Sequence, residues 1–153
     1  MNQLVATDEN GSYLFDQIVE GAQLNIIPVK TDDYMNGVST MDLILIQKHI
    51  LGLEQLPNSF RILAADINNS GQITASDLIA LRKAILGTKD GFPQNSSWRF
   101  LDSDFQFPDP FNPFVSGLQD NYAINGLDQN MNVDFVGIKV GDVNYSVDMN
   151  SSE

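Results

Sequence analysis

The stretch that decides the fold is Asp66-Ile67-Asn68-Asn69-Ser70-Gly71-Gln72-Ile73-Thr74-Ala75-Ser76-Asp77, which runs directly into an apolar, helix-forming segment. Oxygen-bearing side chains stand at positions 1, 3, 5, 9 and 12 of this stretch, and position 6 is glycine. This is the pattern of a calcium loop, because calcium takes about six to eight oxygen ligands from carboxylates, amides, backbone carbonyls and water. Alternate donors converge on one point as the chain curls, and glycine permits the tight turn that a Cβ would obstruct.

The predicted ligands differ in what each contributes. The first three side chains alternate along the loop, and Gln72 offers a carbonyl at position 7. Asp77 falls in the first turn of the following helix, where it closes the shell with both oxygens and suits the helix dipole. A capped turn without metal is the alternative, since Asn, Ser and Gly also form ordinary turns. The predicted metal ligands of this loop are Asp66, Asn68, Ser70, Gln72, Thr74 and Asp77.

The composition bounds the class of protein. The chain has 153 residues, about the size of one domain, and its 42% hydrophobic content is enough for a core. A net charge of −12 argues against nucleic acid as a partner, and no run is long enough to insert into a membrane. Without cysteine there is no disulfide or thiolate metal site. The single histidine, His49, leaves little scope for zinc or a serine triad, and we interpret it as a surface or boundary residue of a helix.

A segment of fifteen residues occurs twice. Val38–Gly52 aligns with Ile73–Gly87 at an offset of 35 residues, and seven of the fifteen pairs are identical. The identical residues include an Asp before the apolar run and the Gly that ends it, which two unrelated amphipathic helices are not expected to share. The sequence therefore predicts a helix in each copy, over 41–51 and 76–86, and a shorter helix over 58–65 that enters the calcium loop.

The loop before the first copy departs from the calcium pattern. In register with the second loop, its positions 1 and 5 are threonine and methionine, neither of which supplies a strong calcium ligand. Shifting the register by one residue puts Gly37 at position 6 but leaves the closing Asp42 one residue short. We predict Asp33 and Asp42 as ligands here. The sequence leaves open whether this loop binds calcium or is held by hydrogen bonds alone.

A third fragment, Asp142-Val143-Asn144-Tyr145-Ser146, repeats the alternation of positions 1, 3 and 5 near the end of the chain. No glycine follows it, and no helix exits from it, so the second half of a calcium loop is missing. We interpret the fragment as a polar strand end. The alternative is that it supplies an extra ligand or half a site.

The flanks of the helical part predict β-structure. Asp8–Gly11 is a hairpin turn signal, and apolar residues stand on both sides of it. Leu24–Val29 and Val133–Val140 read as strands, and Ser97–Leu101 reads as a short one within an irregular, proline-interrupted region. The early strands are too few for a sandwich, so they must pair with later strands of this chain or with another chain.

Three segments follow from these patterns. Residues 1–30 form a β-strand segment, 31–87 the duplicated loop and helix unit, and 88–153 an irregular loop with a strand that completes the domain. The predicted class is α+β, with paired helices packed against a small antiparallel β portion that comes from both termini.

The calcium loop, the helix that ends at Gly87 and the second copy about 35 residues away resemble the dockerin type I family over residues 31–87. Modules of that family pair two F-hand calcium loops, which are shortened relatives of the EF-hand. The flanking segments look like a β-sandwich repeat that runs into a dockerin-like unit in large secreted or surface-attached bacterial proteins.

The resemblance implies an extracellular or cell-surface, calcium-dependent and non-catalytic module that binds a cohesin-like protein through its helix faces. It also implies which positions contact the partner. In the second copy these are Ala75, Ser76, Arg82 and Lys83, and in the first they are Thr40, Met41, Gln47 and Lys48.

The alternative function is a structural subunit of a cell-surface assembly or filament, whose partner is another copy of itself. It rests on the predicted strands, because unpaired strand edges invite pairing between chains. An enzyme is the third class. No nucleophile motif, phosphate loop or convincing pair of carboxylates favours catalysis, so we predict that the chain is not an enzyme.

Overall fold

The computed structural model describes residues 2–31, 33–115 and 117–149. Helices and short strands both occur in it, and the predicted α+β class is confirmed. The elements, in chain order, are β1 (Gln23–Ile26), α1 (Thr40–Ile50), α2 (Ser59–Ala65), α3 (Ala75–Ile85), β2 (Trp98–Asp102), β3 (Tyr122–Asn125) and β4 (Phe135–Lys139).

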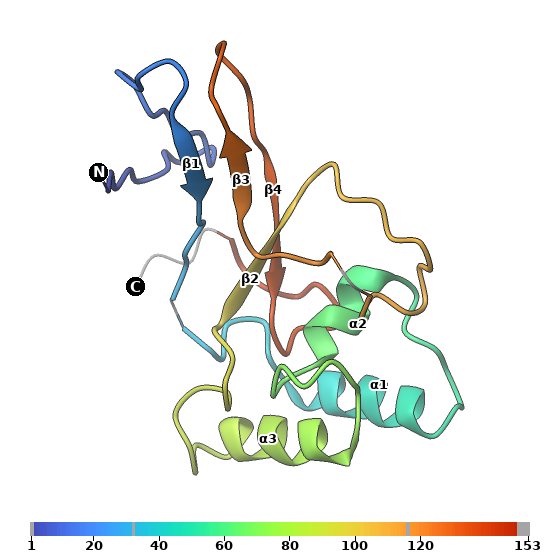
Figure 1. Cartoon of the computed structure of the whole chain (residues 1–153). Coiled ribbons are helices and arrows are strands. Elements are labelled where there is room, and N and C mark those ends of the chain that lie inside the picture. Colours follow the sequence, from blue (N-terminus) through green and yellow to red (C-terminus); the bar gives the residue numbers. More distant parts are fainter. Residues whose placement is uncertain (1, 32, 116, 150–153) are drawn as a thin grey trace.

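Two antiparallel two-stranded sheets join distant parts of the chain. β1 pairs with β3, with Gln23 opposite Asn125, and β2 pairs with β4, with Trp98 opposite Lys139. The early strand thus finds its partner within the same chain. Figure 1 shows the β1–β3 ribbon projecting away from the helices.

The amino-terminal hairpin prediction is wrong. The turn itself forms, because Asp8 Oδ1 accepts hydrogen bonds from the N–H groups of Asn10 and Ser12. No strand flanks it within the described residues. Leu4 and Ala6, the apolar residues before the turn, are exposed, so that side of a hairpin would have no surface to pack against, although Tyr13 and Phe15 after the turn are half-buried.

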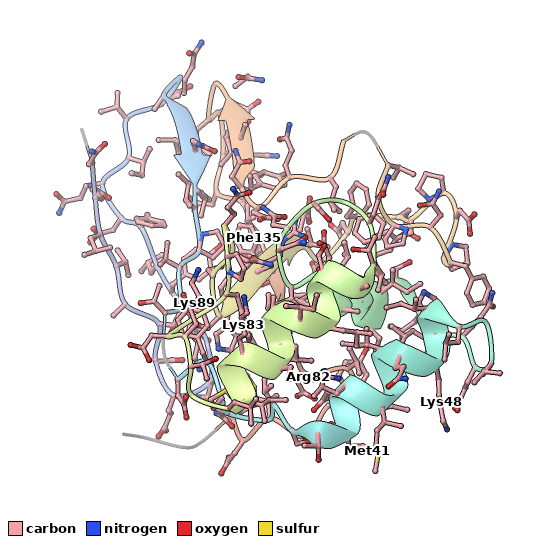
Figure 2. The ribbon with its side chains drawn as sticks, turned by 90° about the horizontal axis from the view of Figure 1, so that it is seen from below. Met41, Lys48, Arg82, Lys83, Lys89 and Phe135 are labelled. Carbon is pink, nitrogen blue, oxygen red and sulfur yellow. The ribbon has the colours of Figure 1, made fainter. Side chains whose placement is uncertain are left out.

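α1 and α3 lie side by side and run in opposite directions, as Figures 1 and 2 both show. Each is wound from one copy of the repeat, and each begins with a capping box, Ser39 with Asp42 and Thr74 with Asp77. These boxes satisfy N–H groups that the first turn of a helix leaves without partners. The duplication in sequence is therefore a duplication in structure.

The core lies between the helices and the carboxyl-terminal part of the chain. Ile46 of α1, Leu81 of α3 and Ile67 of the 66–77 loop are fully buried in one cluster. Val140 and Val143, just after β4, are buried in the same cluster, and the N–H of Gly141 donates to the Ala64 carbonyl of α2 at 2.9 Å. The segment just after β4 is thus packed into the helical unit.

None of the helices in the described part of the chain is long and apolar enough to cross a membrane.

Candidate metal centre

The two carboxylates of the 66–77 loop are buried at its opposite ends. Asp66 follows α2 directly, and its two oxygens accept hydrogen bonds from the N–H groups of Ser70 and Gly71, each at 2.9 Å. Asp77, in the first turn of α3, accepts from Asn68 N at 3.2 Å with one oxygen and from the Thr74 N–H at 2.8 Å with the other. The loop therefore curls so that position 12 reaches back to position 3.

The uncharged donors of the loop gather between these carboxylates. The Asn68 amide oxygen accepts from Ser70 N at 3.1 Å, and the Ser70 hydroxyl donates to the backbone carbonyl of Gln72 at 3.1 Å. The Gln72 side chain is exposed, so the carbonyl predicted at position 7 is that of the backbone. Gly71 has a φ of +78°, a conformation that L side chains rarely adopt, which explains the glycine at position 6.

Burial of the two carboxylates is electrostatically unfavourable. The pKa of the Asp77 carboxyl is raised, first by burial and to a lesser degree by the nearby Asp66 charge, although hydrogen bonds from Thr74 and Asn68 oppose the rise. Two like charges held together away from water are unfavourable unless a cation compensates them.

The donor set fits calcium. It consists of carboxylate, amide, hydroxyl and backbone oxygens, which are the ligands a hard cation prefers, and it contains neither sulfur nor imidazole. A bound calcium ion would supply positive charge and hold the loop in shape, and Asp66, Asn68, Ser70, the Gln72 carbonyl, Thr74 and Asp77 would hold it. Across the described ranges, no three His, Cys, Asp or Glu side chains gather as a metal site. The 66–77 loop is consistent with this, because its ligand set has two carboxylates and its other oxygens are neutral.

Among the described residues, no hydrogen bond links Asp33 to Asp42, the two ligands predicted for the first loop. Asp33 is exposed, and its Oδ1 accepts from the N–H of Met35 at 2.7 Å in a local turn. Asp42 is fully buried and accepts from Ser39 N at 2.8 Å and from the N–H of Val143 at 2.9 Å. Burial, followed by the charge of Asp142, raises the pKa of Asp42.

Asp142 is not among the ligands predicted from the sequence, which indicated a polar strand end there and left an extra ligand or half a site as the alternative. Its alternation with Asn144 and Ser146 was the signal for that alternative.

The predicted partner positions lie on the helices. Ala75 and Ser76 are exposed at the start of α3, and Arg82 and Lys83 are exposed near its end. Figure 2 places Lys83 on the same side of α3 as Lys89, and Lys48 towards the end of α1, beyond Met41. The Lys48 ammonium pairs with Glu54 at 2.9 Å. Large apolar side chains on the same helices are also exposed, namely Met41, Ile44, Ile79 and, just past α3, Leu86.

Comparison with known proteins identifies the helical unit. Residues 36–86 match the family model of the dockerin type I domain, which covers 51 of the 153 residues. The searches of curated proteins and of solved structures gave no match to the chain. Residues 36–86 of this chain are a dockerin-like module.

Proposed function

We propose that this chain is an extracellular attachment module, in which calcium shapes the dockerin-like unit for binding to a cohesin-like partner. Dockerin type I domains mediate calcium-dependent attachment between proteins and are non-catalytic modules. The observation that carries the proposal is the 66–77 loop, whose buried carboxylates and neutral oxygens converge at the start of α3.

Calcium acts here on shape. Asp77 belongs both to the loop and to the first turn of α3, and Leu81, one turn further on, is fully buried in the core shared with α1. An ion held by Asp66 and Asp77 therefore fixes where α3 begins relative to α2. Because the folded loop binds the ion and the unfolded chain hardly does, calcium stabilises the fold by mass action.

The exposed side of α1 and α3 is the proposed docking surface. It combines exposed apolar side chains, Met41, Ile44 and Ile79, with the basic residues Arg82 and Lys83. Apolar anchors that leave water, surrounded by charges that orient the partner, are typical of protein interfaces. A partner with an apolar patch and acidic residues beside it fits this surface.

The test is thermal unfolding with calcium and with chelator. We expect the melting temperature to rise with calcium and to fall in chelator, and Asp66→Ala or Asp77→Ala to reduce the rise clearly. Asp128→Ala, which removes an exposed carboxylate outside both loops, is the matched control and keeps the full rise. A melting temperature of the wild-type chain that is the same in calcium and in chelator contradicts the proposal.

A second candidate function, assembly with another copy through strand pairing, is favoured by the β1–β3 ribbon. Among the residues that the structure describes, this sheet has two strands, and Ile27 and Val29, which follow β1, are exposed. Strands at a sheet edge offer unpaired backbone groups to another chain. Analytical ultracentrifugation of the chain with and without residues 1–30 decides between the two. A polymer that disappears on truncation supports assembly, and a monomer in both cases supports the attachment module.

A further inference from the structure

The segment that follows β4 folds in the same way as the first half of the calcium loop. The two oxygens of Asp142 accept the N–H groups of the residues four and five positions further on, at 3.1 and 2.8 Å. Asp66 makes the same two hydrogen bonds in the 66–77 loop, both at 2.9 Å. Asp142 is also buried to the same degree, with 2% of its surface exposed against 1% for Asp66.

The correspondence extends to the next positions of the loop. The Asn144 amide oxygen accepts the N–H two residues further on at 3.0 Å, as the Asn68 oxygen does at 3.1 Å. The residues that follow them have the same left-handed backbone, with φ values of 61° at Tyr145 and 54° at Asn69. Positions 1 to 5 of a calcium loop are therefore present at the end of the chain.

The second half of that loop is supplied by residues 37–42, more than a hundred positions earlier in the sequence. The Ser146 hydroxyl donates to the backbone carbonyl of Gly37 at 2.8 Å, just as Ser70 donates to the Gln72 carbonyl at 3.1 Å. Gly37 and Gln72 correspond to each other, because each directly precedes one copy of the fifteen-residue repeat. The carbonyl expected at position 7 is thus in place.

The closing carboxylate is in place as well. Asp42 accepts from Ser39 N at 2.8 Å with one oxygen and from Val143 N at 2.9 Å with the other. Asp77 likewise accepts from Thr74 N at 2.8 Å and uses its other oxygen to hold the start of its loop. Asp42 therefore closes over the 142–147 segment as Asp77 closes over 66–71.

Gly37 allows the two segments to approach so closely. A Cβ at this residue would lie 2.6 Å from the Cα and N of Val147 and 2.9 Å from Asp142 Oδ2. Only glycine fits at this point between the 37–42 and 142–147 segments. The sequence has no glycine after Ser146, and the structure brings Gly37 against that point from the other segment.

We propose that these two segments form a second calcium site, split across the chain. The inference rests on the calcium dependence in the proposed function. Three of its ligands, Asp142, Asn144 and Ser146, lie outside the family match, which covers residues 36–86 only. The donor types are those of the 66–77 loop, position by position. The proposed ligands are Asp142, Asn144, Ser146, the Gly37 carbonyl, Ser39 and Asp42.

The split site explains the poor ligands before the first copy. Thr31 and Met35 stand where a continuous loop would need donors, and Asp142 and Ser146 take those positions instead. Asn36 has a different task, since its side chain bonds the backbone of Asp148 twice, at 2.8 and 3.0 Å. Calcium would therefore tie the end of the chain to the start of α1.

The test counts calcium ions per chain by isothermal titration and by metal analysis after dialysis. We expect two ions on the full wild-type chain, one on Asp142→Asn, one on Asp66→Asn and none on the double variant. Asp33→Asn is the matched control and keeps two ions. Two ions on Asp142→Asn, or the loss of one on Asp33→Asn, overturns the split site.

The outcomes separate this inference from the proposed function. A single ion that Asp66→Asn removes and Asp142→Asn leaves overturns the split site while the calcium-dependent attachment module stands. No ion on the wild-type chain overturns both. If Asp142→Asn does not fold, Asn144→Ala replaces it, since Asn144 is half-buried and its side chain is bonded only within its own loop among the described contacts.

Asn144→Ala should weaken one of the two sites by about tenfold or more, and Asn68→Ala should weaken the other by a similar factor. If both sites of Asn144→Ala keep the calcium affinity of the wild type, the split site is contradicted.

Chymotrypsin gives an independent readout, because Tyr145 is 53% exposed and lies between two proposed ligands. Cleavage there should slow in calcium for the wild type and for Asp66→Asn but not for Asp142→Asn. Equal cleavage with and without calcium in the wild type contradicts the inference.

Discussion

At the scale of single residues, the two glycines at the centre of the loops have different reasons to be glycine. Gly71 has a φ of +78° and nothing within 4 Å of where a Cβ would stand. Gly37 has a similar φ of +77° but meets backbone atoms of Val147 at 2.6 Å. Conformation alone selects the first, whereas conformation and a long-range contact both select the second.

Gly37→Ala should therefore cost more stability than Gly71→Ala. The left-handed backbone costs an alanine about 1 to 2 kcal/mol at either position. At Gly37 the displaced Val147 backbone adds about 1 to 3 kcal/mol of overpacking. Urea unfolding of both variants in chelator measures the free energy of unfolding without any contribution from bound metal. Equal losses would show that the carboxyl-terminal segment does not press on Gly37 in solution.

His49 predicts a pH dependence. Its Nδ1 accepts the N–H of Leu56 at 3.2 Å, and burial lowers the pKa of its imidazole below the usual value. The unfolded chain therefore takes up the proton first as the pH falls through about 6.5, so the free energy of unfolding contributed by neutral His49 is present above that pH and lost below it.

The comparison is urea unfolding of the wild type and of His49→Gln at about pH 7.5 and about pH 5.5, in chelator. We expect the wild type to lose more stability than the variant on acidification. Carboxyl groups titrate in both proteins, so the difference between the two isolates His49. If His49→Gln loses as much free energy of unfolding on acidification as the wild type, His49 is not the cause of the pH dependence.

At the scale of helices and strands, local signals in the sequence were sufficient for the helices. Ser39 and Thr74 with Asp42 and Asp77 three residues later mark where α1 and α3 begin, and the observed bounds lie within about two residues of the predicted ones. Gly52 and Gly87, both with positive φ, follow α1 and α3. These signals act over one or two turns, so a single sequence contains them in full.

The strands and the split loop depended on distant partners. β3 was not predicted, because its four residues are stabilised by β1 about a hundred residues earlier and stand in an irregular region. Similarly, the contacts of Ser146 with Gly37 and of Val143 with Asp42 span 109 and 101 residues. Alternation in the sequence identified Asp142, Asn144 and Ser146 as a fragment, but nothing local indicated where its other half lies.

The exposed faces of α1 and α3 predict where a partner binds. Ile79 on α3 is 53% exposed, so Ile79→Asp should leave the core intact and abolish binding to a cohesin-like partner. Leu14→Asp, which changes an exposed apolar residue outside the helices, is the matched control and should bind normally. Surface plasmon resonance against a panel of cohesin modules measures the effect, with the calcium-dependent melting temperature as a check of folding. Unchanged binding by Ile79→Asp would place the interface elsewhere.

At the scale of the whole molecule, the two calcium loops would close the chain on itself. One loop joins α2 to α3, and the other would join the segment after β4 to the start of α1. Residues 66–71 thus complete the loop of the second copy, and residues 142–147 would complete the loop of the first. The shared core agrees with this arrangement, because Val140 and Val143 are buried with Ile46 and Leu81. The segment just after β4 therefore shares its core with the helices.

The stability of the whole chain should then respond to calcium as a two-site protein. Well above the dissociation constant, each site adds about 1.4 kcal/mol to the free energy of unfolding for every tenfold rise in free calcium. Two sites give about 2.8 kcal/mol per tenfold rise, and Asp142→Asn or Asp66→Asn should each give half of that slope. Urea unfolding in calcium buffers measures it, with magnesium at the same ionic strength as the control, because Mg²⁺ demands a smaller and more regular octahedral site. A wild-type slope of about 1.4 kcal/mol that Asp142→Asn does not change would leave 66–77 as the one loop through which calcium stabilises the fold.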